Sequence, residues 1–233
     1  MSDRFWFFVL GGLIAIGLCI GLTHNASANL NLQLHRSEVG ASGNELVIIP
    51  VLTEAAYQPK GFYDYYSGRC DESCLTIPIN TSISLHEQGS ASGVRTLEKL
   101  GYYTMDDFHL EYQLRNNPRY LESFDKIIVL HSEYVTQRIF DALQNHPKVI
   151  YLYPNSLYGK VEINKFTATL IQGHDYKGKS NGFDWVHDTT RFEKDKACLS
   201  HEFIQIENGY YLNCNPEIII HQNIDILKEL KYL

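Results

Sequence analysis

Polar and aromatic side chains follow three apolar runs of strand length, and such residues can bind a ligand or move a proton. The runs are residues 45–52, 126–130 and 148–153, each typical of a buried parallel strand. Ligands of open α/β sheets bind beyond the carboxyl ends of the strands. We therefore predict a ligand-binding crevice made by the residues that follow the runs: Thr53, Glu54 and Tyr57, then His131, Glu133 and Tyr134, then Asn155 and Tyr158.

Within this set, His131 and Glu133 are the candidates for catalysis because they combine an acid/base side chain with a carboxylate. They lie two positions apart, so both face one site only if the turn is kinked. A structural alternative stays open. Glu133 is close to the start of the next predicted helix, where a carboxylate stabilises the helix dipole.

Three short motifs at these positions resemble one known family. Residues 50–57 (PVLTEAAY), followed by 61–63 (GFY), resemble its T-x-x-A-Y segment. Residues 130–134 (LHSEY) resemble its G-H-D-E-Y-W segment, and residues 155–158 (NSLY) resemble its G-N-x-x-Y segment. The family is named for the C-terminal-like domain of the large chain of N,N-dimethylformamidase, and its members are glutamine-amidotransferase-like domains of flavodoxin-like fold. The resemblance spans about residues 46–160.

The resemblance implies an amidohydrolase site with one iron held by two tyrosinates and a glutamate, beside an acid/base histidine. Carried over by motif, Tyr57 and Glu133 are the metal ligands and His131 is the helper. Hard oxygen ligands suit a ferric ion. No motif places the second tyrosine, for which Tyr63, Tyr65 and Tyr66 are the alternatives.

Two functions follow as expectations. The favoured one is a non-catalytic domain without a cofactor that binds a small polar ligand, a glycan or an extracellular partner protein, because the loop from Tyr57 to Tyr66, including Tyr63, offers aromatic faces for stacking. The alternative is the iron-dependent amidohydrolase. The His- and acid-rich residues 174–201 match no known metal-site spacing and predict a solvated loop.

The elements that must position these residues predict an α/β fold. A strand at 126–130, a helix capped by Thr136, and a strand at 148–153 form a right-handed crossover between parallel strands. We predict a doubly wound, mainly parallel, flavodoxin-like sheet. Residues 53–73 are expected to form a loop, and residues 90–100 a helix capped by Ser90 or Ser92.

The last third of the chain predicts antiparallel rather than parallel strands. Residues 202–207 and 210–214 flank Asn208-Gly209 and predict an antiparallel β-hairpin that places Phe203 opposite Cys214. Residues 75–79, 166–171 and 218–220 are further strand candidates, and residues 223–230 a closing helix.

The N-terminus predicts export. Arg4 precedes an apolar run from Phe5 to Leu22, close to the roughly 20 residues that span a bilayer. Ala26-Ser27-Ala28 then matches a signal peptidase site. We predict residues 1–28 as a signal peptide or signal anchor, 29–44 as a linker and 45–233 as a single α/β domain that is extracellular or at the cell surface. Membrane contact is expected only through an uncleaved N-terminal segment.

Cysteine use and charge agree with that compartment. Cys70, Cys74, Cys198 and Cys214 predict two disulfides, with the sequence-local pairs favoured and the crossed pairings left open. Asn80-Thr81-Ser82 is a glycosylation sequon if the host glycosylates. The net charge of -7, without a basic patch, argues against nucleic acid as a partner.

Overall fold

The computed structural model describes residues 37–81, 85–86, 90–183 and 190–233. The chain divides into two compact units, 1–40 and 41–233, and the fold described below is that of the second unit. The predicted signal segment and residues 29–36 of the predicted linker lie outside the described residues. Within the described ranges, no helix is both long and apolar enough to span a bilayer.

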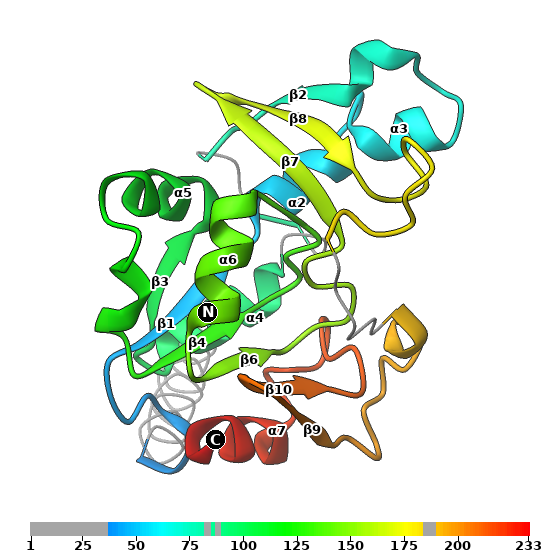
Figure 1. Ribbon diagram of the computed structural model, residues 1–233. Coiled ribbons are helices and arrows are strands. Elements are labelled where there is room, and N and C mark those ends of the chain that lie inside the picture. The colour runs from blue at the N-terminus through cyan, green and yellow to red at the C-terminus, as the bar shows by residue number, and fades with distance from the viewer. Residues whose placement is uncertain (1–36, 82–84, 87–89, 184–189) are drawn as a thin grey trace, which may run out of the picture. The chain divides into compact units, whose positions relative to one another are not determined.

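A six-stranded sheet forms the centre of the second unit (Figure 1). Its order is β3 (Tyr103–Asp106), β1 (Glu45–Ile49), β4 (Lys126–Val129), β6 (Val149–Tyr151), β10 (Gly209–Leu212) and β9 (Phe203–Ile206). The first five strands pair in parallel, and β9 pairs antiparallel with β10. The predicted α/β fold, with a mainly parallel sheet and a C-terminal antiparallel pair, is confirmed.

The order of the strands creates a switch point beside β1. The chain passes from β1 to β3 on one side, then crosses to β4 and β6 on the other side. Connections that leave neighbouring strands in opposite directions open a crevice at their carboxyl ends. The strand ends at this switch point are Ile49 of β1 and Val129 of β4, and the sequence placed its first two groups of candidate residues directly after them.

Helices cover both faces of this sheet. On one face, Leu110 and Leu114 of α5 (Asp107–Asn116) and Ile139 and Leu143 of α6 (Gln137–Asn145) join the strand residues in one buried core. Figure 1 shows α4 (Ala91–Lys99) and α6 on opposite sides of the sheet. The helix α7 (Ile224–Tyr232) is capped by Asn223, the predicted first residue, whose side chain accepts from the backbone N–H of Ile226.

A second, four-stranded sheet was not predicted. Its order is β2 (Thr76–Pro78), β8 (Thr167–Gln172), β7 (Gly159–Asn164) and β5 (Tyr134–Val135). This sheet packs with α2 (Val51–Tyr57) and α3 (Phe62–Tyr66) in a separate core. Single 3-10 turns at Glu72–Leu75, Tyr120–Ser123 and Thr190–Phe192 complete the described elements.

Several local predictions are wrong. The apolar run at 45–52 leaves the sheet after Ile49 and continues as α2, so residues 53–73 form two helices and a 3-10 turn rather than a loop. Ser90 makes no cap bond with its side chain, and residues 218–220 form turns. In the hairpin, Phe203 lies opposite Leu212, not Cys214.

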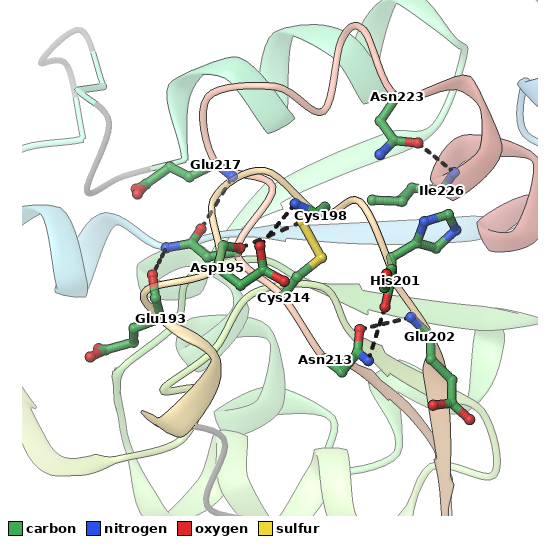
Figure 2. The surroundings of a disulfide bond; sticks show 12 residues. Glu193, Asp195, Cys198, His201, Glu202, Asn213, Cys214, Glu217, Asn223 and Ile226 are labelled. Atoms are coloured by element: carbon green, nitrogen blue, oxygen red, sulfur yellow. Dashed lines mark hydrogen bonds between the residues drawn. A yellow bond between two sulfur atoms is a disulfide. The ribbon is translucent and has the colours of Figure 1, made fainter.

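Both predicted local disulfides are present. Cys70 bonds to Cys74, directly after α3, and Cys198 bonds to Cys214 across the base of the β9–β10 pair. Figure 2 shows the second bond and its surroundings. Two disulfides indicate an oxidising compartment, because cytosolic thiols are kept reduced.

Candidate functional site

Three side chains meet at the carboxylate of Glu133, which is fully buried. The hydroxyl of Tyr57 donates to its Oε1 at 2.9 Å, and the hydroxyl of Tyr63 donates to its Oε2 at 2.6 Å. Nε2 of His131 lies 2.9 Å from the same Oε1. The structure thus brings together His131, Glu133 and Tyr57, and it adds Tyr63, which no sequence motif could place.

Each member of this group, the Glu133 cluster, comes from an element at the switch point. Tyr57 is the last residue of α2, which follows β1, and Tyr63 lies on the next helix, α3. His131 and Glu133 lie between β4 and β5. The kink that a shared site requires is present, because the backbone N–H of Ser132 bonds back to the carbonyl of Leu130 at 2.6 Å.

Two hydroxyl groups hold the backbone of the kinked segment. Oγ1 of Thr53, on α2, accepts from the backbone N–H groups of Glu133 at 2.8 Å and Tyr134 at 3.3 Å. Oγ of Ser90 accepts from the backbone N–H of His131 at 3.1 Å. Ser90 adopts a φ of 56°, which directs it to His131 instead of the helix start. The predicted ligand-binding Thr53 is therefore a support for Glu133.

Charge in the cluster is divided between one acid and one base. Burial opposes the charge of Glu133, but the ion pair with His131 and the hydrogen bonds from His131, Tyr63 and Tyr57 outweigh burial and lower its pKa. Burial also acts against the charge of His131, while Glu133 and Glu217 raise its pKa to about 10. The pKa values of Tyr57 and Tyr63 are raised by burial and by the charge of Glu133. The two phenols are therefore neutral donors to a carboxylate in this state.

Aromatic rings form a wall on the side of Tyr63. Its ring stacks on that of Tyr57 with centroids 4.1 Å apart. The ring of His174 lies 4.0 Å from Tyr66 and 5.7 Å from Tyr63, and its Nδ1 lies 3.0 Å from the hydroxyl of Tyr158. The predicted Tyr158 thus reaches the wall through His174, which the sequence analysis had assigned to a solvated loop.

Other predicted residues serve the fold. The carboxylate of Glu54 accepts from Gln58 and from His86, whose Nδ1 lies 2.7 Å away, so its partners are not members of the Glu133 cluster. Tyr134 is completely buried and packs against Phe62 in the second core. Asn155 adopts a left-handed φ of 61° after β6, as asparagine tolerates, and shapes the turn that follows.

Glu217 reaches the cluster from the C-terminal region, and sequence reasoning missed it. It is 7% exposed, and its Oε1 lies 3.5 Å from Nδ1 of His131. No motif or spacing links position 217 to position 131, since only the fold brings the turn after β10 to β4. The ring of His131 therefore lies between two carboxylates.

A large groove lies elsewhere and carries no comparable chemistry. It has a volume of about 1000 Å³ and is lined by α5, α6 and β7. Its buried acid, Glu111, is engaged by Arg115 at 3.0 Å, by the hydroxyl of Thr136 at 2.6 Å, and by Arg138. These paired groups hold α5 to α6, which is a structural role.

Comparison with known proteins adds no identification. No family model and no curated protein matches the chain. In the described part of the chain, no three His, Cys, Asp or Glu side chains are grouped to hold a metal ion, and a metal at the Glu133 cluster would depend on phenolate oxygen.

Proposed function

We propose that this chain is an exported hydrolase of amide bonds that uses an iron ion held by Tyr57, Tyr63 and Glu133. The observation that carries the proposal is the convergence of two tyrosine hydroxyls, at 2.9 and 2.6 Å, on the two oxygens of one buried carboxylate. The resemblance to the dimethylformamidase-like family implies two tyrosines and one glutamate as iron ligands. The motifs place only Tyr57 and Glu133, and we assign Tyr63 as the second tyrosine.

The residues fit a ferric ion by their chemistry. All three donors are oxygen atoms, which suit a hard cation. A cation would replace the phenol protons that now satisfy Glu133, and it would offset the buried negative charge. When bound, such an ion supplies Lewis acidity, which polarises an amide carbonyl and acidifies a water molecule.

The protein's own groups perform the remaining tasks. His131 lies 2.9 Å from Glu133 and is placed to hold a proton next to the ligand set and pass it to the departing amine. Thr53 and Ser90 fix the backbone that carries both residues. The overall reaction adds water across the amide and releases a carboxylic acid and an amine.

Metal analysis and an amine-release assay on the full-length chain test this proposal. We expect about one iron per chain and hydrolysis of simple amides, both lost in Glu133→Gln. Glu54→Gln is the matched control, because Glu54 is also a buried acid after a neighbouring strand but binds Gln58 and His86. Iron-free wild-type protein, or equal iron in both variants, would contradict the proposal.

The aromatic wall favours a second candidate function, the binding of a glycan or partner without catalysis. Tyr65, Tyr66 and Tyr176 are partly exposed, and the ring of Tyr65 lies edge to face with those of Tyr66 and Tyr176, with centroids 5.9 and 6.0 Å apart. Aromatic faces of this kind stack on sugar rings. Under this alternative, Tyr65→Ala would weaken binding on a glycan array, and Glu133→Gln would leave it unchanged.

A further inference from the structure

Two buried polar atoms beside the Glu133 cluster face each other and have no other hydrogen-bond partner. They are Nδ1 of His131 and Oε1 of Glu217, which lie 3.5 Å apart. A buried carboxylate oxygen without a partner is costly, so its position calls for an explanation. Hydrogen bonds at catalytic sites are often long before substrate binds and tighten later.

The fold holds Glu217 in this place through the second disulfide. The backbone N–H of Glu217 donates to Oδ1 of Asn215 at 3.2 Å, and the backbone N–H of Asn215 donates to the carbonyl of Asp195 at 2.7 Å. Cys198 and Cys214 join the two chain segments that carry these residues (Figure 2). The turn with Glu217 is therefore tied to the β9–β10 region rather than left as a loose surface loop.

We propose that Glu217 is a positioning residue, which accepts the Nδ1–H of His131 and thereby turns Nε2 of His131 toward Glu133. The inference rests on the proposed function for its purpose, because a fixed ring presents one defined nitrogen to the reacting groups. Active-site histidines are commonly oriented in this way by a carboxylate on their second nitrogen.

The test is nuclear magnetic resonance of the metal-free, full-length chain labelled with ¹⁵N in histidine. We expect His131, assigned by the loss of its signals in His131→Asn, to carry a slowly exchanging proton on Nδ1. Glu217→Gln keeps an acceptor oxygen and should keep this proton, whereas Glu217→Ala should lose it. Glu229→Ala is the matched control. Glu229, on α7, also pairs with a histidine, since its Oε1 lies 3.0 Å from Nε2 of His201, but neither residue belongs to the Glu133 cluster.

The outcomes separate this inference from the proposed function. If His131 of the wild type carries no proton on Nδ1, the positioning role of Glu217 is overturned. The role is also overturned if the slowly exchanging proton persists in Glu217→Ala. Iron affinity provides a second readout, with an expected loss of about 10- to 100-fold in Glu217→Ala and rescue in Glu217→Gln. A chain that binds no iron but shows the expected proton would remove the proposed function and leave Glu217 as the residue that orients His131.

Discussion

Replacing Thr53 by valine should destabilise the protein, because it removes the hydroxyl that holds the backbone of Glu133. Thr53 is fully buried, and its Oγ1 accepts from the backbone N–H groups of Glu133 and Tyr134. Valine has nearly the same shape, so the substitution removes the acceptor without creating a cavity. Each buried donor that loses its partner costs about 1–3 kcal/mol. Because the second bond, at 3.3 Å, is the weaker one, we expect a total of about 2–4 kcal/mol.

Urea denaturation of Thr53→Val and wild type measures this difference. Thr169→Val is the matched control, because the hydroxyl of Thr169 bonds to that of Thr76 at 2.9 Å in an exposed position on the second sheet. Surface substitutions of this kind stay within about 0.5 kcal/mol. A loss of the same small size in Thr53→Val would refute the argument that this hydroxyl holds the Glu133 segment.

Three further changes probe the frame around the site. The carboxylate of Glu45 lies 3.1 Å from the ammonium of Lys126, and Lys126→Met leaves it buried without this charged partner. In urea denaturation, the free energy of unfolding should fall by about 3–5 kcal/mol, and adding Glu45→Gln should restore part of it. Replacing Cys198 and Cys214 by serine should lower stability by about 3 kcal/mol, the value for a loop of this length, and a change below about 1 kcal/mol would contradict it. Gly209→Ala should prevent β10 from pairing with β6 and lower the melting temperature, because a Cβ there would lie 1.8 Å from the carbonyl oxygen of Val149; an unchanged melting temperature would contradict it.

The parallel sheet could be predicted from sequence because its signals are local. The run at 126–130, the cap at Thr136 and the run at 148–153 lie in one short stretch, and the structure has β4, α6 and β6 there. The Thr136 side chain accepts from the backbone of Ile139, as its position predicts. In the second sheet, β2 and β8 overlap the strand candidates at 75–79 and 166–171, but their pairing could not be predicted, since β5 has only two residues and pairs with β7 through the fold.

The candidate site could be predicted in part for the same reason. His131 and Glu133 directly follow β4, and Tyr57 ends the short helix that follows β1, so the rule for strand ends finds all three. Choosing Tyr63 over Tyr65 requires knowing that these residues form a helix, and the run before them indicated a strand and loop instead. Glu217 is brought to His131 by the fold of the last strand pair alone, which no spacing in the sequence reveals.

Visible absorption of the iron-loaded chain is the decisive assay for Tyr57, Tyr63 and Glu133 as one metal-binding set. Tyrosinate bound to ferric iron gives a charge-transfer band, so wild type should be coloured. Tyr63→Phe should lose or shift the band, whereas Tyr65→Phe, the same change two positions away on α3, should keep it. An iron-loaded wild type without the band, or a Tyr63→Phe spectrum identical to that of wild type, would show that these residues do not bind the metal together.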